Sequence, residues 1–292
     1  MTDTWSSYGL RLPKQMHLVA ELPLPIDEGD FLASTRDHRV ISNLNMEASS
    51  SLLAQMVKLH FMLIEVNNLN SQTVTGQLNE IETLAIVDSI SKRLSDWYSA
   101  VPPYMRNTSE NLNRYAAQGL GRMFVALYLG YYNYGQLLFY QFLDSERHSS
   151  QIQYPLYSAK CKANAIQLCE IVYTANTIPG CEIKYMMAGH VLAIASTVQI
   201  HTLLFGESDV EIQAAKSRLK RNYEILTYLK KYWSTLDITF KRFEEFHTLC
   251  QVSMDTSYRM DRRMLNFLLE FAKPLNEDDN NIKVGNSFHF GI

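Results

Sequence analysis

The residues between Arg122 and Asp144 form an uncharged run, and its centre, YLGYYNYGQLLFYQFL at 128–143, holds five tyrosines, two phenylalanines and two glycines. The run is long enough for a membrane span, which needs about 20 apolar residues. However, its asparagine, its glutamines and its phenol hydroxyls would be costly in hydrocarbon. Because a helix that is apolar nearly all round is normally surrounded by other helices, we expect Met123 to Leu143 to be the central, buried helix of an α-helical domain.

Two features of this run set conditions on its packing. Gly130 and Gly135 each cost a helix roughly 1 kcal/mol relative to alanine, which is tolerable where the missing side chains let neighbouring helices approach. Buried tyrosines also need hydrogen-bond partners for their hydroxyls. Two interpretations remain open: a filled, hydrogen-bonded core, or a cavity in which some of the hydroxyls meet an organic ligand.

The rest of the chain is typical of helices as well. Apolar residues recur at steps of three and four residues, and Pro102-Pro103, Pro179-Gly180 and Gly206 separate these segments. Thr108 or Ser109 is expected to cap the helix that runs from about residue 112 into the uncharged run. The other predicted helices cover 52–66, 78–101, 157–173, 183–205, 209–233, 242–252 and 263–271.

The sequence shows no alternation of strands and helices, no repeat of fixed period and no interdomain linker. We therefore predict an all-α fold, a single multi-helix, bundle-like domain at 31–273 with the tyrosine-rich helix buried at its centre. Residues 1–30 are predicted to form an extended entry segment, and 274–292 a polar tail.

The charge of the chain argues against a nucleic-acid-binding protein. The formal net charge is -3, from 27 basic and 30 acidic side chains, so no positive excess favours a polyanion. One basic cluster lies in the predicted 209–233 helix and has acidic neighbours. It is most simply a solvated helix face, with a phosphate- or importin-binding patch as the alternative; its members are Lys216, Arg218, Lys220 and Arg221.

Motifs for catalysis and metal binding are missing from the sequence. There is no glycine-rich phosphate loop, no nucleophile elbow and no zinc-protease motif. The four cysteines lack paired metal-site spacing and are expected to be reduced and mostly buried, in an intracellular compartment; they are Cys161, Cys169, Cys181 and Cys250. We expect no metal, no cofactor and no catalytic residue.

A ligand site, if the domain has one, is expected where the tyrosine-rich helix meets the 183–205 helix. Small-molecule sites combine apolar walls with a few polar groups. The two histidines of the second helix are eleven residues apart, roughly 16 Å along a helix, which is too far to share a metal. The candidate ligand-binding residues are Tyr131, Tyr134, Tyr140, Gln141, His190 and His201.

Several short motifs occur along the chain in the same order as in a known family. They are LPLPIDE at 22–28, Leu94 and Trp97 followed by Val101-Pro102 and Met105, LLFYQFL at 137–143, Cys161 with Ala163 and Ala165, His190, and the segments YWSTLDITFKRFEEFH at 232–247 and DTSYRMDRRMLNFLLEFAKP at 255–274. In this order they resemble the regulatory domain of fungal transcription factors, the middle homology region, which normally follows a six-cysteine binuclear zinc cluster.

The chain departs from that family in two places. Tyr140 and Gln141 stand where many relatives have Arg-Pro, so a contact made by that arginine does not carry over. The six cysteines of the zinc cluster and the usual start of the domain are missing from this chain. We expect it to correspond to the C-terminal portion of such a regulator, or to a free-standing domain of this kind.

The resemblance implies a regulatory or effector module of a fungal zinc-cluster-type transcription regulator, in the nucleus, with the cytoplasm possible for a truncated chain. It would contact protein partners of the transcription machinery or a small-molecule effector, with a homodimer as an option. By itself the chain is expected neither to bind DNA specifically nor to enter a membrane. The alternative is a helical domain of this family repurposed as a small-molecule binder or cofactor-free enzyme of fungal secondary metabolism.

Overall fold

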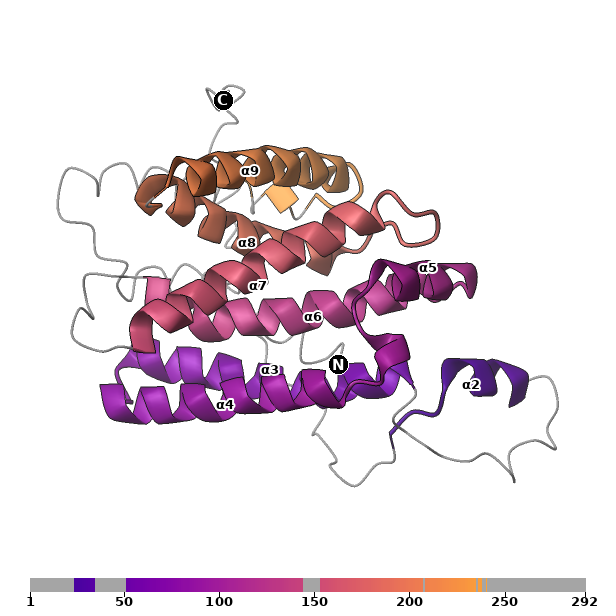
Figure 1. Ribbon diagram of the computed structural model, residues 1–292, viewed down its shortest axis with the longest axis horizontal. Coiled ribbons are helices and arrows are strands. Elements are labelled where there is room, and N and C mark those ends of the chain that lie inside the picture. The colour runs from indigo at the N-terminus through magenta and orange to yellow at the C-terminus, as the bar shows by residue number, and fades with distance from the viewer. Residues whose placement is uncertain are drawn as a thin grey trace.

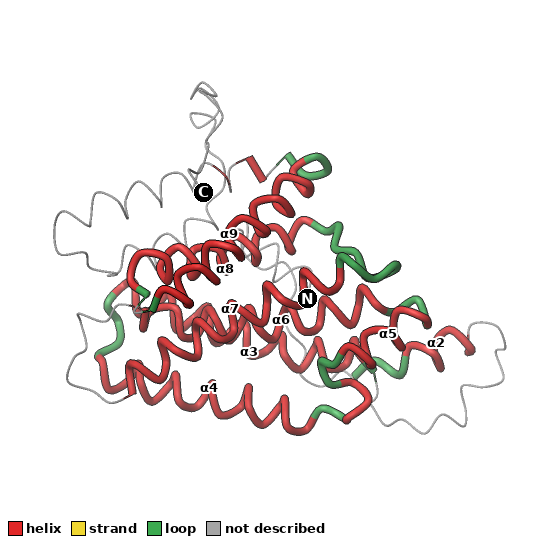
Figure 2. Tube along the Cα trace, turned by 45° about the horizontal axis from the view of Figure 1, so that its top comes forward, coloured by secondary structure: helices red, strands yellow, loops and turns green. Residues whose placement is uncertain are grey.

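The computed structural model describes residues 24–34, 51–143, 153–206, 208–234, 236–237 and 240. These residues form helices joined by short loops, with no strand among them (Figure 2). The predicted all-α fold is therefore confirmed. The elements are α2 (Glu28–Ser34), α3 (Leu52–Thr75), α4 (Glu80–Ala100), the 3-10 turn η2 (Pro103–Met105), α5 (Ser109–Ala117), α6 (Gly121–Phe139), the 3-10 turn η3 (Tyr140–Leu143), α7 (Gln153–Ala175), α8 (Met186–Phe205) and α9 (Asp209–Lys230).

Some predicted segments cannot be compared with the structure. The expected helices at 242–252 and 263–271, the tail at 274–292 and Cys250 lie outside the described residues. Of the entry segment predicted to be extended, only the end is described. Residues 24–27 lack regular structure, and α2 begins at Glu28, where the Asp27 carboxylate accepts a hydrogen bond from the Gly29 backbone N–H at 2.8 Å.

Helix α6 lies in the middle of the molecule (Figure 1). The α3–α4 pair covers one side of it and α7 covers the other, with α8 and α9 beyond α7. Fifteen of its nineteen residues are buried, which leaves it almost no solvent-facing side. The uncharged run is thus the central buried helix that its composition predicted.

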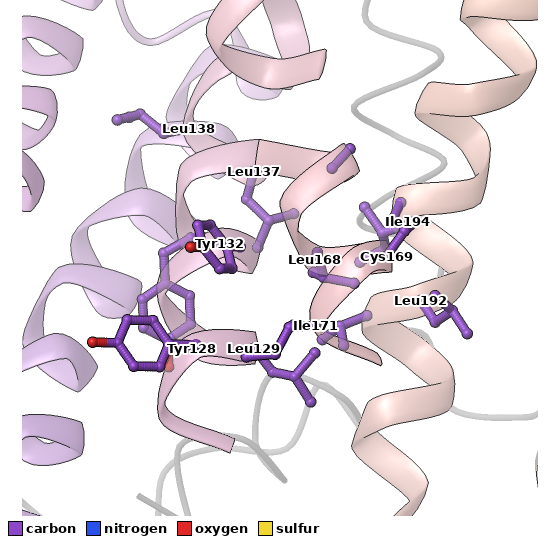
Figure 3. Packing of buried hydrophobic residues seen from close by; sticks show 14 of the residues in the cluster. Tyr128, Leu129, Tyr132, Leu137, Leu138, Leu168, Cys169, Ile171, Leu192 and Ile194 are labelled. Carbon is purple, nitrogen blue, oxygen red and sulfur yellow. The ribbon is translucent and has the colours of Figure 1, made fainter. Parts of the chain in front are cut away.

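The side chains of α6 divide between its two neighbouring layers. Tyr128 and Tyr132 point to one side, whereas Leu129 and Leu137 point toward α7 (Figure 3). The α7 side chains there include Leu168 and Ile171, and Leu192 and Ile194 of α8 extend the same apolar cluster. One continuous core therefore joins the two halves of the bundle.

Helix ends follow local capping chemistry. Thr108 is the N-cap of α5, as expected, and its hydroxyl accepts from the Asn111 backbone N–H at 3.2 Å. Ser51 and Ser208 cap α3 and α9 in the same way, and Asn79 forms a reciprocal capping box with Glu82 at the start of α4. Side-chain oxygens at these positions satisfy N–H groups that have no partner inside the helix.

The prediction of one helix from about Leu112 into the uncharged run is wrong. Helix α5 ends at Ala117, and α6 begins at Gly121 after a turn in which Gly119 has a φ of 76°. A left-handed residue stops a helix, and glycine adopts that conformation without strain. Gly121 is also needed for close packing, because a Cβ there would lie 3.1 Å from the Ala116 Cα and 3.2 Å from the Gly180 carbonyl oxygen.

One helix among the described residues, α8, is long and apolar enough to cross a membrane by length and composition alone. However, 78% of its apolar window is buried against the rest of the chain. Burial of this extent is what the core helix of a globular domain shows, so the composition of α8 is weak evidence for a membrane span.

We expect Phe139→Ala to lower the free energy of unfolding by roughly 3–5 kcal/mol, because it empties a large aromatic site in the core. Phe139 is 3% exposed, and its ring stacks on Tyr157 with 5.4 Å between centroids. The measurement is chemical denaturation of the purified chain. Phe61→Ala on α3, where the ring is 38% exposed, is the matched control and should cost below about 1 kcal/mol. Equal losses in the two variants would contradict the assignment of Phe139 to the core.

Candidate functional site

The six candidate ligand-binding residues do not gather in one place. Tyr131 faces α4, on the side of α6 away from α7 and α8, and its ring stacks on Trp97 and on Tyr98 with centroid distances of 5.2 Å in both cases. Burial raises the pKa of the Tyr131 phenol to about 12, so the hydroxyl is neutral at physiological pH. Tyr131 is thus a packing residue between α6 and α4.

The two glycine notches of α6 are filled by side chains of the chain itself. A Cβ at Gly130 would lie 3.4 Å from the Tyr134 hydroxyl oxygen, so the phenol of Tyr134 folds back over Gly130 of its own helix. A Cβ at Gly135 would lie only 2.5 Å from the Asn164 side-chain oxygen. Gly135 therefore allows α7 to approach closely, as expected, whereas Gly130 accommodates a residue of α6.

Tyr140 joins the end of α6 to α8. It is 1% exposed, and its hydroxyl oxygen lies 2.5 Å from the Thr197 hydroxyl oxygen. The Thr197 hydroxyl donates to the Ile194 carbonyl at 2.7 Å. Since a hydroxyl has one proton to donate, Tyr140 is the donor and Thr197 the acceptor in the contact between the helices.

His201 lies one turn beyond Thr197 on α8 and also contacts the end of η3. Its ring packs on Phe205 at 4.9 Å, and it forms a hydrogen bond with the Leu143 carbonyl. Burial, with the positive charge of Lys162 adding to it, lowers the pKa of His201 to about 4 despite the bond to Leu143. The imidazole is therefore neutral, and its Nδ1 atom is buried without a hydrogen-bond partner among the described residues.

The remaining two candidates lie apart from each other. Gln141 belongs to η3, and its Nε2 atom is buried without a hydrogen-bond partner in the described part of the chain. His190 is half-buried near the start of α8, roughly 16 Å along the helix from His201. The structure thus brings Tyr140 and His201 to one junction between η3 and α8, with Gln141 in the same turn, and it leaves Tyr131 and His190 elsewhere.

A polar link that the candidate set did not include lies within α6 itself. Gln136 is fully buried, its Nε2 donates to the Asn133 side-chain oxygen at 2.8 Å, and the same nitrogen is 3.5 Å from the Val191 carbonyl of α8. The Cys161 thiol of α7 donates to the Gln136 backbone carbonyl at 3.4 Å. The sequence signal was the pair of amides three residues apart in an uncharged run, since such residues share a helix face.

A second unpredicted polar cluster ties α7, α8 and α9 together around Asn222. Its side-chain nitrogen donates to the Ser196 hydroxyl at 2.9 Å and to the Cys169 sulfur at 3.3 Å, and its oxygen accepts from the Tyr173 hydroxyl at 2.6 Å. Burial raises the pKa of Cys169 to about 11, so the thiol is protonated and unreactive. This Asn222 cluster is hydrogen-bonded throughout and holds helices together.

The cysteines and the potential metal ligands of the described residues can be compared with the sequence prediction. Cys161, Cys169 and Cys181 are free and buried, as expected. Among the described residues, no group of three or more histidine, cysteine, aspartate or glutamate side chains could hold a metal ion.

The chain matches no protein-family model, no curated protein and no solved structure.

Acid should destabilise the fold through His201. Its folded pKa of about 4 lies below the ordinary value near 6.5, so the unfolded chain binds the proton first as the pH falls. The contribution of neutral His201 to the free energy of unfolding is complete above pH 6.5 and is lost progressively as the pH falls to about 4. Between pH 7 and pH 5 the free energy of unfolding should fall by roughly 2 kcal/mol.

The measurement is urea denaturation at pH 7 and pH 5 of the wild type and of His201→Leu. The variant should be less sensitive to pH by about that amount, whatever its stability at pH 7. If both proteins lose the same free energy between the two pH values, His201 is not the group responsible.

Proposed function

We propose that this chain is the regulatory or effector module of a fungal zinc-cluster-type transcription regulator, and that it acts through protein contacts on its helical surface. The ordered sequence motifs support the first part of the proposal. The second part rests on one observation: side chains of the chain itself occupy three places where a ligand was expected. Tyr134 and Asn164 fill the two glycine notches, and the Tyr140 hydroxyl is bonded to Thr197.

The residues of the leucine–tryptophan motif support the resemblance as a pattern of core packing. Leu94, Trp97, Val101 and Met105 are all buried, and Trp97 stacks on Tyr131 of α6. The Met105 carbonyl also accepts a hydrogen bond from the Tyr128 hydroxyl at 2.5 Å. The burial of these residues is compatible with a motif that is kept for packing the core.

The charge of the chain bears on whether such a module could recognise DNA by itself. With a net charge of -3 and without the six cysteines of a zinc cluster, it lacks the DNA-reading element that such regulators use and has no overall positive excess. We therefore assign DNA recognition to a separate domain or subunit, and assign control of transcription to this one.

The test is to fuse the chain to an unrelated DNA-binding domain and to measure transcription of a reporter gene. We expect a severalfold change, in either direction, relative to the DNA-binding domain alone. Leu138→Asp is the control, because a charge at this fully buried position should unfold the domain and abolish the effect. A reporter that responds identically with and without the folded domain would contradict the proposal.

A small-molecule binder or cofactor-free enzyme of secondary metabolism is the second candidate. It is favoured by Gln141 Nε2 and His201 Nδ1, two buried polar atoms without hydrogen bonds among the described residues, in a region that also contains Tyr140. Buried polar atoms of this kind normally have a partner, which can be a ligand.

The second candidate predicts a compound that raises the melting temperature of the wild type in a thermal-shift screen of a metabolite library. The same compound should lose its effect on Tyr140→Phe and retain it on Tyr131→Phe, because Tyr131 lies on the opposite side of α6 against Trp97. A shift that is equal in both variants would place the binding elsewhere.

A further inference from the structure

Helix α9 carries the strongest local charge in the described part of the chain. From Lys216 to Lys231 there are six basic residues and one acidic residue, Glu224, a net charge of +5 (6 − 1), in a chain whose total is -3. The acidic residues Asp209 and Glu211 lie before this stretch, in the first turn of the helix. The positive charge is therefore concentrated in the middle and at the end of α9.

The solvent-facing side of α9 combines this charge with aromatic rings. Arg221, Tyr228 and Lys231 are exposed and fall on one side of the helix, since steps of seven and three residues return to the same face. Tyr232 follows directly, and the exposed fractions of Tyr228 and Tyr232 are 43% and 57%. We call these four residues, together with the exposed Lys220, the α9 basic face. The exposed Glu224 lies on the same side, three residues after Arg221 and four before Tyr228, so the charged residues of this side sum to +2 (3 − 1).

Not every cation of α9 is available to a partner. Arg218 faces Glu170 at 3.7 Å, and Lys230 forms an ion pair with Asp237. By contrast, Lys220, Arg221 and Lys231 form no ion pair with a described residue.

Contacts with neighbouring side chains restrict the residues of the α9 basic face. The Arg221 guanidinium lies over the Tyr173 ring, 3.9 Å from its centroid, and Tyr173 is bonded to Asn222. The Tyr228 and Tyr232 hydroxyls lie 3.2 Å apart, with their rings edge to face. A guanidinium stacked on a ring and a bonded pair of phenols lose less side-chain entropy on binding than free side chains do.

We propose that the α9 basic face binds an acidic segment of a partner protein. Carboxylates of that segment pair with Lys220, Arg221 and Lys231, and its apolar side chains pack on Tyr228 and Tyr232. Arginine and tyrosine are enriched where binding energy is concentrated in protein interfaces, and arginine matches the geometry of a carboxylate. This inference rests on the proposed function, for which it names the surface and the chemistry of the partner.

Two other anionic occupants fit the face less well. A nucleic acid is a long polyanion that the negative remainder of the chain repels, whereas a short acidic segment covers only the basic helix. A membrane surface normally takes up an apolar face of residues such as leucine and phenylalanine. The exposed rings of this face are the two phenols, with Trp233 beside them at 38% exposure, and among the described residues of α9 no leucine or phenylalanine is exposed.

The experiment measures fluorescence anisotropy of a labelled peptide of alternating glutamate and leucine with the full chain. The reference probes are the same peptide with lysine in place of glutamate, a DNA duplex, and vesicles containing phosphatidylserine. The acidic peptide should bind, and the lysine peptide should not. Arg221→Glu combined with Lys231→Glu should weaken binding by about tenfold or more, and salt should weaken it in the wild type.

Tyr228→Ala combined with Tyr232→Ala should weaken binding without removing its salt dependence. Lys92→Glu is the control for charge: it reverses one positive charge at an exposed site on α4, a change of -2 against -4 in the double variant, and should leave binding intact. Thermal denaturation verifies that each variant is folded.

Absence of binding to the acidic peptide would overturn the inference, as would equal binding by the wild type and the charge-reversal variant. If the duplex or the vesicles bind more tightly than the acidic peptide, and the charge-reversal variant loses that binding, then nucleic acid or membrane is the occupant of the face and the acidic segment is not. If the peptide does not bind while the reporter response of the fused chain persists, this surface is wrong and the proposed function stands. If the peptide binds through the face but the reporter does not respond, the surface is right and the proposed function is wrong.

Discussion

Burial of α6 on all sides is the constraint on which the rest of the structure depends. A helix without a solvent-facing side needs a layer of neighbours on each side, and the α3–α4 pair and α7 provide them. The far side of α7 is covered in turn by α8, and α9 packs on α8, so these two helices form a further layer. The all-α architecture with one continuous core follows from this demand.

The same burial explains the hydrogen bonds that connect the helices. An unbonded hydroxyl or amide in the core costs about 1–3 kcal/mol, so the polar groups of α6 reach beyond their own helix. Tyr128 reaches the Met105 carbonyl, Tyr132 accepts from Asn107, and Asn70 of α3 donates to the Leu137 carbonyl. These contacts fix how each layer sits on α6, which apolar packing alone would leave less specific.

Three of the six candidate ligand residues are taken up by contacts within the chain, which directs the question of function to the surface. Two of the side chains predicted to bind a ligand pack against the chain instead. Tyr131 stacks on two rings of α4, and Tyr134 covers Gly130. What remains open to partners is a surface on which charge is unevenly distributed, with the positive stretch of α9 in a chain that is negative as a whole. The buried Asn222 cluster anchors that helix to α7 and α8.

The sequence by itself determined the helical class, the buried central helix and several helix ends, but α3 runs to Thr75 where the predicted helix ended at Val66. These properties depend on local information: the three- and four-residue periodicity of apolar side chains, the cap at Thr108 and the stop at Pro102-Pro103. The break between α5 and α6 was missed, because glycine is compatible with a helix and Gly119 becomes a stop only when the turn adopts a positive φ.

The candidate site was only partly predictable. Tyr140 and His201 do come together at the junction of η3 and α8, whereas Tyr131 points to the other side of α6. Helical periodicity shows which residues share a face, but it does not show which neighbouring helix that face will meet. Only the tertiary structure decided those pairings, because they join residues far apart in the chain whose contacts form when the layers pack.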